Sequence, residues 1–389
     1  MRILVIGGTG PTGPYIVNGL VDRGHHVTIF HTGRHEVDSL PPRSVVPHIH
    51  GDPFDLDSTS ACLDGQTFDV VFAMYGRLRM LVDYLVGKTP RLFSIGGVPV
   101  YPGFVNDVDR FPTGMKFPSA ESDAYPPLAQ PSGLAEPSLR ADHRSDKIGK
   151  IIASEARVFE LHPQATHFRY PYIYGAHQVV PKEWPVVKRA LDRRKPLILA
   201  DGGRTVESAA YVENVAHAVL LAVDHIDRSA GQVYNVADDE LYSRLQVVDV
   251  VEEELGHRFE RINLPYEVAA PAYPTIHHHS SQHRIIDTGK IRNELGYRDI
   301  VPPLEALRRT IRWQVANLPA DHERVDQVLQ DPFDYDAEDR LAQLYRRFVA
   351  DCGAVDFDVH PGYSSGYYGP EENPGGKRAG MRAPVNPAP

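Results

Sequence analysis

The chain of 389 residues has only two cysteines, Cys62 and Cys352, and no long apolar run. Two cysteines far apart in sequence exclude a disulfide framework and favour a reducing compartment. A transmembrane helix needs about 20 apolar residues, and the short apolar stretch at the N-terminus indicates a strand rather than a secretion signal. We therefore expect a cytoplasmic protein that does not engage a membrane.

A basic surface is also missing from the sequence. Lysine and arginine number 41 against 51 acidic residues, which gives a formal net charge of -10. Proteins that bind nucleic-acid backbones carry basic stripes, so we expect no nucleic-acid partner. The hydrophobic content of 42% is typical of a globular protein, and the length suffices for one large or two ordinary domains.

The most informative pattern that is present lies at residues 3–13, which read ILVIGGTGPTG. An apolar run at 3–6 breaks into glycines, and a helix-like segment at 15–23 and a second apolar run at 27–30 follow. This order of strand, glycine turn, helix and strand is typical of a dinucleotide site.

Each glycine of this turn has a physical role in such a site. Gly7 allows the tight exit from the strand, Gly10 lets the backbone approach a pyrophosphate, and Gly13 lets the helix pack closely. The helix N-terminus then faces the phosphate charge. The spacing G-x-x-G-x-x-G differs from the G-x-G-x-x-G of dehydrogenases, and the alternative is an ordinary tight turn between a strand and a helix.

Alternating strands and helices continue through the first half of the chain and predict a parallel sheet with helices on both faces. The fold class is therefore α/β, a Rossmann-type doubly wound sheet with a smaller C-terminal α/β substrate-binding region. The predicted strands are 45–50, 70–74, 91–95, 166–170 and 233–236, and the predicted helices are 55–63, 76–86, 145–161, 213–223, 245–255 and 304–315.

Changes in composition suggest the domain boundaries. We expect a nucleotide-binding domain at 1–175, a substrate-binding region at 176–318 interleaved with the sheet, a helical extension at 319–352 and a Pro/Gly-rich tail at 353–389. Residues 102–140 lack periodicity and are rich in Pro, Ser, Asp and Gly, which indicates a long functional loop such as a lid.

With these pieces in order, residues 1–318 resemble the extended short-chain dehydrogenase/reductase superfamily in its epimerase/dehydratase branch. Five segments in the right order carry the resemblance, although each alone is weak. They are the glycine turn at 7–13, Gly51-Asp52, Val98-Pro99-Val100-Tyr101, the segment RYPYIYG at 169–175 and the segment YVENVA at 211–216.

The resemblance implies a bound nicotinamide dinucleotide. At the end of the second strand, where NAD-preferring relatives carry an acidic residue, this chain has His31, and Arg34 is placed to pair with a 2′-phosphate. We therefore predict NADP, with NAD as the alternative. The cofactor-binding residues that follow are Gly7, Thr9, Gly10, Pro11, Thr12, Gly13, His31, Arg34, Asp52, Lys150, Tyr170, Pro171 and Tyr172.

The catalytic pattern of the family is incomplete. Its members use a Ser or Thr, a Tyr acid/base and a Lys four residues after that Tyr, which lowers the Tyr pKa and holds the nicotinamide ribose. Here Gly97 stands at the Ser position, and the helix that should carry Tyr and Lys has no tyrosine between His143 and Lys150.

Two registers are open for that helix. The spacing to Arg169 favours Lys150 as the lysine and places Asp146 in the Tyr position. A shift of three residues would instead make Lys147 the lysine and His143 the Tyr replacement. Tyr101 is a further candidate acid, because it follows the fifth strand at the edge where ligands of open α/β sheets bind. We predict Lys150, Tyr101 and Asp146 as catalytic residues.

Other signals concern the substrate and metals. Sugar-nucleotide epimerases carry an Arg for the diphosphate where this chain has Glu207, although Arg204 lies three residues earlier, so we expect a less charged small organic substrate. The run of histidines at 277–279 with His283 suggests a metal. Consecutive histidines point in different directions and no acidic cluster adjoins them in sequence, so we predict no metal site.

Two functions remain open at this point. The first is an NAD(P)-dependent oxidoreductase or epimerase/dehydratase with a non-standard catalytic centre. The second is a non-catalytic NADP-binding sensor or scaffold. Resemblance to the family also implies a homodimer through the helices near 76–86 and 145–161.

Overall fold

A computed structural model describes residues 1–74, 78–125 and 143–356, without the side chains of 143–147 and 322. It divides into two compact units, Met1–Glu338 and Asp339–Pro389. In the second unit the described residues continue helix α12 (Tyr335–Gly353). No helix in the described ranges is long and apolar enough to cross a membrane.

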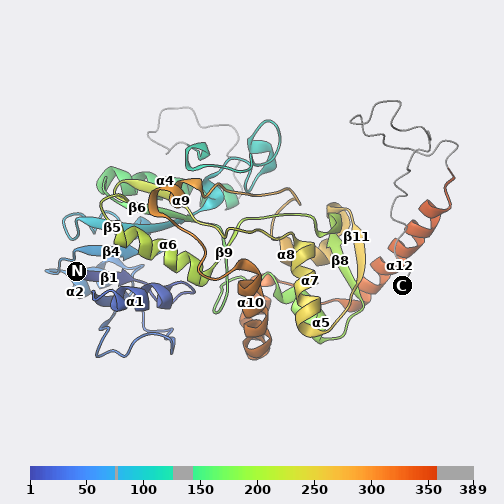
Figure 1. Cartoon of the computed structure of the whole chain (residues 1–389), viewed down its shortest axis with the longest axis horizontal. Coiled ribbons are helices and arrows are strands. Elements are labelled where there is room, and N and C mark those ends of the chain that lie inside the picture. Colours follow the sequence, from blue (N-terminus) through green and yellow to red (C-terminus); the bar gives the residue numbers. More distant parts are fainter. Residues whose placement is uncertain (75–77, 126–142, 357–389) are drawn as a thin grey trace, which may run out of the picture. The chain divides into compact units, whose positions relative to one another are not determined.

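The first unit is built around a sheet of seven strands in the order β10-β6-β5-β4-β1-β2-β3, all paired in parallel (Figure 1). Starting from β3, this is the 3-2-1-4-5-6 order of dinucleotide-binding folds with one further strand. The prediction of a Rossmann-type doubly wound sheet is therefore confirmed. Its strands are β1 (Arg2–Ile6), β2 (His26–His31), β3 (His48–His50), β4 (Val70–Ala73), β5 (Arg91–Gly97), β6 (Thr166–Tyr170) and β10 (Gln232–Asn235).

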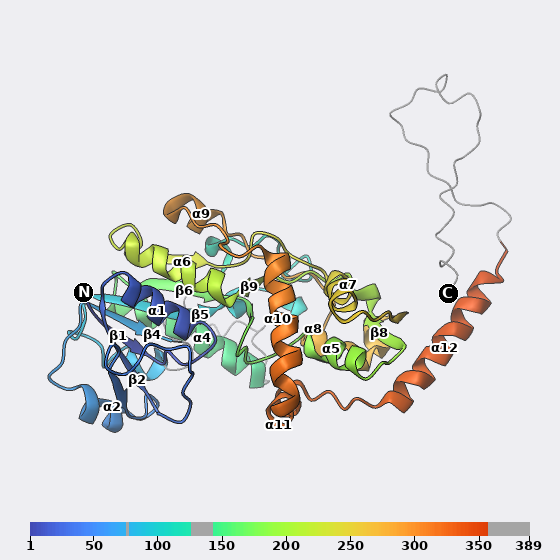
Figure 2. The same cartoon turned by 60° about the horizontal axis from the view of Figure 1, so that its bottom comes forward.

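Helices cover both faces of this sheet because successive side chains of a strand point to opposite sides. Ile3 and Val5 of β1 belong to a core that includes α1 and α6, which lie side by side (Figure 2). Leu4 and Ile6 belong to a second core with α2, α3 and α4. These helices are α1 (Gly13–Asp22), α2 (Leu56–Leu63), α3 (Leu78–Leu81), α4 (His143–Leu161) and α6 (Val212–Asp224).

The smaller α/β region of the same unit has its own core, in which Trp184, Val251 and Ile311 are buried. It contains two two-stranded parallel sheets, β11-β8 and β7-β9. Its strands are β7 (Tyr172–Tyr174), β8 (Pro196–Ala200), β9 (Ala209–Tyr211) and β11 (Glu260–Leu264). The remaining helices of the unit are α5 (Trp184–Leu191), α7 (Arg244–Leu255), α8 (Tyr273–Ile276), α9 (Gly289–Leu295), α10 (Pro303–Asn317) and α11 (His322–Leu329).

Two predicted elements are shorter in the structure. The strand predicted at 45–50 covers only His48–His50. The helix predicted at 76–86 begins its described part at Leu78 and ends at Leu81, because turns with bonds from Val86 N to Asp83 O and from Lys88 N to Leu85 O replace it. Leu81, Val82 and Leu85 are nevertheless buried in these turns. The helical spacing of the apolar residues therefore predicted which side chains are buried, but it did not predict the length of the helix.

Two predicted segments lie partly outside the described residues. Of the loop at 102–140, residues 102–125 form turns and short 3-10 helices. Of the tail at 353–389, only residues to 356 are described. The lid, the tail and the domain boundaries at 175, 318 and 352 stay predictions.

Candidate functional site

The glycine turn follows β1, whose neighbours are β2 and β4. The strand order therefore reverses direction here, and open α/β sheets bind ligands at such a switch point. Gly7 and Gly8 have φ of 107° and 79°, a region that favours glycine. The N–H of Gly7 donates to the carbonyl of Phe30 at 2.9 Å, which fixes the exit from β1 beside the end of β2.

The other two glycines of the turn differ in the space around them. A Cβ on Gly13 would lie 2.3 Å from the carbonyl oxygen of Gly8, whereas a Cβ on Gly10 would meet nothing within 4 Å. Thr12 is the buried N-cap residue of α1. Gly13 is therefore needed for the turn to close, while Gly10 leaves the space in front of the α1 N-terminus open.

At the β2 end of this edge, the structure places a carboxylate where the sequence analysis expected none. Glu36 lies with Oε1 3.6 Å from His31 Nε2, and Arg43 donates to that same oxygen at 2.9 Å. Burial, which is the largest effect, lowers the pKa of His31, so its imidazole is a weak source of positive charge. The end of β2 therefore has a carboxylate beside His31 although the strand itself carries none, because the loop after β2 returns Glu36 to this place.

The remaining cation of the predicted adenosine end is Arg34. Its residue is exposed, and its guanidinium has no ion-pair or hydrogen-bond partner in the described part of the chain. Asp52 follows the last residue of β3 by two positions, and its side chain accepts a hydrogen bond from Phe54 N at 2.9 Å. Arg34 is thus available to an anion, whereas Asp52 shapes its own turn.

The end of β6 supplies Tyr170, Pro171 and Tyr172, which separate into two environments. The Tyr170 hydroxyl is buried and makes no hydrogen bond of ordinary geometry among the described residues. Burial raises its pKa, while Thr12 acts in the opposite direction. Tyr172 instead uses its hydroxyl internally, donating to Glu183 and accepting from Lys182 N at 3.0 Å. Tyr170 therefore adjoins the glycine turn with an unsatisfied polar atom, and Tyr172 faces the smaller region.

Tyr101 lies in a buried network at the ends of β5, β6 and β10. Its hydroxyl donates to Asn235 Oδ1 at 2.6 Å and accepts from Arg169 Nη1 at 3.0 Å. Burial raises the pKa of Tyr101 to about 12, despite the opposing effect of Arg169. The side chain is only 1% exposed. Tyr101 is therefore held protonated and fully bonded.

The network continues through Arg169 to α4. Glu155 accepts two bonds from Arg169, at 2.5 and 3.0 Å, and lies 3.3 Å from His167 Nε2. Burial alone would raise the pKa of Glu155, but the bonds and charges of His167 and Arg169 lower it to about 2. The other ring nitrogen of His167 lies 2.7 Å from Ser94 Oγ. The sequence analysis missed Glu155, His167 and Asn235, since their only signal was a polar residue on the buried face of an element.

The other predicted catalytic positions lie around α4 and β5. Gly97 ends β5 and supplies no hydroxyl. Lys150 is exposed and stands two residues from both Ile148 and Ile152, which pack in the core beside Tyr101. Residues two apart on a helix point about 200° apart, so Lys150 lies on the opposite side of α4 from that core. Asp146 is on α4, and its side chain, like those of His143 and Lys147, is outside the described residues.

Glu207 is buried in the smaller region among three cationic or basic groups. It pairs with Lys182 at 2.8 Å, with Arg244 at 2.6 Å and with His278 at 2.6 Å. Burial opposes the effect, but these partners hold the pKa of Glu207 well below its usual range. A cavity of about 40 Å³ beside it is also lined by Tyr172, Asp238 and Tyr242.

The histidine run at 277–279 does not converge on one point. His278 is bound to Glu207, and His283 Nδ1 accepts from Val206 N at 3.0 Å. Among the described residues, the group that could hold a metal ion is a different one, composed of His31, Glu36, His48 and His50. The sequence signal for it was the alternation His48-Ile49-His50 in a strand next to His31.

No protein-family model matches the chain. It is 23% identical over 252 residues to the chloroplast stem-loop binding protein of 41 kDa b of Arabidopsis thaliana, covering 61% of this chain and 59% of that protein. It is 27% identical over 149 residues to dTDP-glucose 4,6-dehydratase of Salmonella typhimurium, covering 37% of this chain and 39% of that enzyme. The chain thus spans less than two thirds of the length of either relative.

Solved structures are similar over more of the chain. An epimerase from Methanothermobacter thermautotrophicus matches with a TM-score of 0.61 at 16% identity, covering 83% of this chain and 94% of that one. The Bordetella bronchiseptica enzyme WbmG in complex with NAD matches with a TM-score of 0.59 at 17% identity, covering 86% and 96%. These comparisons confirm the predicted fold, which is that of solved epimerase and dehydratase structures.

Proposed function

We propose that this chain binds a nicotinamide dinucleotide at the glycine turn and acts with it as an oxidoreductase or epimerase/dehydratase on a small organic substrate. The observation that carries the proposal is the turn itself, which lies at the switch point of the sheet, is closed by Gly13 and is open at Gly10. A backbone that leaves space before a helix N-terminus favours a phosphate group there.

The residues present fit this cofactor. Thr9, Gly10, Pro11 and Thr12 would hold the pyrophosphate, and the unsatisfied Tyr170 hydroxyl beside Thr12 would take a hydrogen bond from the ligand or donate one to it. The chemistry that a bound nicotinamide supplies is hydride transfer. The protein's part is to orient the substrate and to exclude water at the edge formed by β5 and β6.

For the choice of dinucleotide we retain NADP. Arg34 is exposed and without an ionic partner in the described ranges, whereas Arg43 compensates the charge of Glu36. A hydrogen-bonded pair of a guanidinium and a phosphate contributes roughly 1.5–3 kcal/mol to the free energy of binding. We expect Arg34→Ala to weaken NADPH binding about tenfold or more and to leave NADH binding nearly unchanged. Arg312→Ala, which changes an exposed arginine of α10, is the control. Tighter binding of NADH than of NADPH by the wild type would overturn the assignment.

For catalysis we propose Lys150 as the ribose lysine, with Tyr101 or Asp146 as the acid. Sequence spacing supports Lys150, and the position of Tyr101 just after β5, at the edge where open α/β sheets bind ligands, supports Tyr101. Because Lys150 lies away from the core that contains Tyr101, the variants Lys150→Ala and Lys147→Ala should be compared directly. Loss of turnover in Lys150→Ala alone supports the assignment, and loss in Lys147→Ala alone contradicts it.

The reaction is tested by following reduced nicotinamide absorbance with aldehydes, ketones and enones. Sugar nucleotides belong in the same panel, because a dTDP-glucose dehydratase is among the relatives. Product formed from any of these substrates supports an enzyme.

The second candidate is a non-catalytic dinucleotide-binding sensor or scaffold. It is favoured by Gly97 at the Ser position and by the engagement of Tyr101 in internal bonds. One relative is named for stem-loop binding, so a labelled RNA stem-loop should be titrated beside the substrates. Tight NADPH binding without turnover would favour this candidate over the enzyme.

The remaining expectations also stay proposals. We propose a homodimer through the segments near 76–86 and α4, since Met80 and Val86 are exposed apolar residues in the first of these segments. Sedimentation of the wild type and of Val86→Glu tests this interface. A cytoplasmic location rests on two unpaired cysteines, Cys62 and Cys352.

A further inference from the structure

Three histidines meet at the outer edge of the seven-stranded sheet because of strand register. In the parallel pair of β2 and β3, His31 stands opposite His50. His48 precedes His50 by two residues, and residues two apart on a strand share a face. The three imidazoles therefore lie on the same side of this edge.

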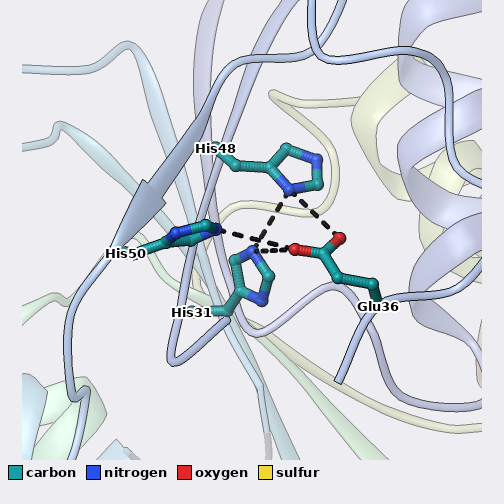
Figure 3. A group of neighbouring side chains, drawn as sticks. All are labelled: His31, Glu36, His48 and His50. Carbon is teal, nitrogen blue, oxygen red and sulfur yellow. Dashed lines mark hydrogen bonds and ion pairs between the residues drawn. The ribbon is translucent and has the colours of Figure 1, made fainter. Parts of the chain in front are cut away.

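A single carboxylate completes the group. The loop that joins β2 to β3 returns Glu36 over the histidines, and Figure 3 shows the four side chains pointing toward one another. His31 and His48 are buried, each with a side chain 3% exposed, whereas His50 and Glu36 are 43% and 38% exposed. The group is thus enclosed on the protein side and reachable from solvent.

The spacing of the four ligand atoms is that of a metal site. His31 Nε2 lies 3.2 Å from His48 Nδ1. Glu36 oxygens lie 3.6 Å from His31 Nε2, 3.4 Å from His48 Nδ1 and 3.6 Å from His50 Nε2. Ligands at about 2.0–2.1 Å from a tetrahedral ion are separated by roughly 3.3–3.4 Å. All four atoms lie within 4.8 Å of one another.

The nitrogens His31 Nε2, His48 Nδ1 and His50 Nε2 all converge on the carboxylate of Glu36, at 3.4–3.6 Å from its oxygens. Arg43 Nη2 donates to Glu36 Oε1 at 2.9 Å, which orients the carboxylate and leaves Oε2 for a ligand.

One contact would have to change on metal binding. Gly33 N–H lies 3.4 Å from His31 Nδ1, and a His31 bound to an ion through Nε2 carries its proton on Nδ1. Because this contact is long, its loss costs little.

We propose that His31, His48, His50 and Glu36 form a binding site for a divalent transition metal of the zinc type. Three imidazoles and one carboxylate suit zinc, and four protein ligands indicate a structural rather than a catalytic ion. The ion would fasten the loop at 32–47 to β3. This loop carries Arg34, so the metal would also fix the adenosine end of the proposed dinucleotide site. The proposal does not depend on dinucleotide binding.

The test uses the full chain without a polyhistidine tag, stripped with a chelator and titrated with Zn²⁺ alone by calorimetry. We expect one high-affinity ion per chain, and with Co²⁺ the intense visible absorption of a four-coordinate site. His50→Ala and Glu36→Gln change partly exposed side chains, so both should fold, as circular dichroism will verify. Each should weaken Zn²⁺ binding about 100-fold or more.

His35→Ala is the matched control, because His35 lies in the same loop, is exposed and is outside the group. Its Zn²⁺ affinity should equal that of the wild type. The absence of high-affinity binding by the wild type would overturn the proposal. Binding that persists unchanged in His50→Ala and Glu36→Gln would also overturn it, since the ion would then be held elsewhere, for example by the histidines at 277–279. Neither result bears on NADPH, which the titration omits.

Discussion

At the β5–β6–β10 end of the sheet the side chains around Arg169 bind one another, whereas at the β2–β3 end three imidazoles converge on one carboxylate. Arg169 has Glu155, Tyr101 and a backbone carbonyl as partners, and Tyr101 has Asn235. At the other end, the oxygens of one carboxylate lie within 3.6 Å of three imidazoles. The same edge of one sheet thus has a closed end and an open end.

The difference separates residues that stabilise the fold from residues that can bind a ligand. A fully bonded buried network holds its residues in one arrangement and loses stability when a member is removed. Exposed groups that converge without strong pairing lose little stability when one of them is changed, but together they can bind a ligand. Substitutions at the closed end should therefore act on stability, and substitutions at the open end on ligand binding.

The largest effect is expected from breaking the buried ion pair of the closed end. Glu155→Gln keeps the shape of the side chain but leaves Arg169 as an uncompensated charge, and such a loss costs about 3–5 kcal/mol. Urea unfolding measures the change in the free energy of unfolding. Arg157→Ala, which changes an exposed ion pair on the same helix, should have little effect. A loss below about 1 kcal/mol in Glu155→Gln would mean that the network does not support the fold.

A pH titration of stability compares Glu155, which is paired with a cation, with Asp238, which is buried and accepts hydrogen bonds from neutral groups. Burial raises the pKa of Asp238 to about 7, from 3.8 when exposed. The folded state therefore binds its proton more tightly, and this stabilisation is complete below about pH 4 and is lost as the pH rises through 7. At about 1.4 kcal/mol per pKa unit, the wild type should lose about 2–3 kcal/mol between pH 5 and 8 relative to Asp238→Asn.

Glu155 should behave in the opposite way. Its pKa of about 2 is below its value in the unfolded chain, so its contribution is present above about pH 4.5 and is lost as the pH falls through 2. If the difference between wild type and Asp238→Asn is the same at pH 5 and 8, the carboxyl of Asp238 titrates normally and this part of the comparison fails.

The smallest effect on stability is expected from Tyr101→Phe. Removal of the hydroxyl leaves Asn235 Oδ1 without its donor and costs about 1–2 kcal/mol. If Tyr101 is also the proposed acid, kcat falls far more than stability does, with KM nearly unchanged. Tyr234→Phe, which removes a hydroxyl bonded to Glu294, serves as the control and should leave kcat unchanged. Equal kcat in the two variants would exclude Tyr101 from the chemistry.

The sequence predicted the fold and the glycine turn because both depend on local patterns. The apolar runs predict the strands, and the glycines at 7, 10 and 13 predict the turn that leads into the helix, all within one short segment. It did not predict the closed network, since Glu155 meets Arg169 only after α4 packs on β6. Nor did it predict the histidine group, because strand register, which is not visible in a single sequence, brings His31 beside His50.

The position of Glu36 shows the same limit. The sequence placed His31 and Arg34 correctly near the end of β2, but the path of the following loop decides which charges accompany them. Glu36, five positions after His31, lies beside the His31 side chain because the loop turns back. The choice of cofactor depends on the paths of such loops, which local sequence patterns do not determine, whereas the strands of the sheet follow directly from such patterns.

The central claim, that the glycine turn binds a dinucleotide, is tested most directly by titrating NADPH and NADH into the wild type and Gly10→Ala. A Cβ at Gly10 meets no protein atom within 4 Å, so the free energy of unfolding should not change, while the methyl group would obstruct the pyrophosphate. The account predicts that the wild type binds a dinucleotide and that Gly10→Ala binds it about tenfold or more weakly. Equal affinity in the two proteins, or no binding of either dinucleotide by the wild type, would contradict it.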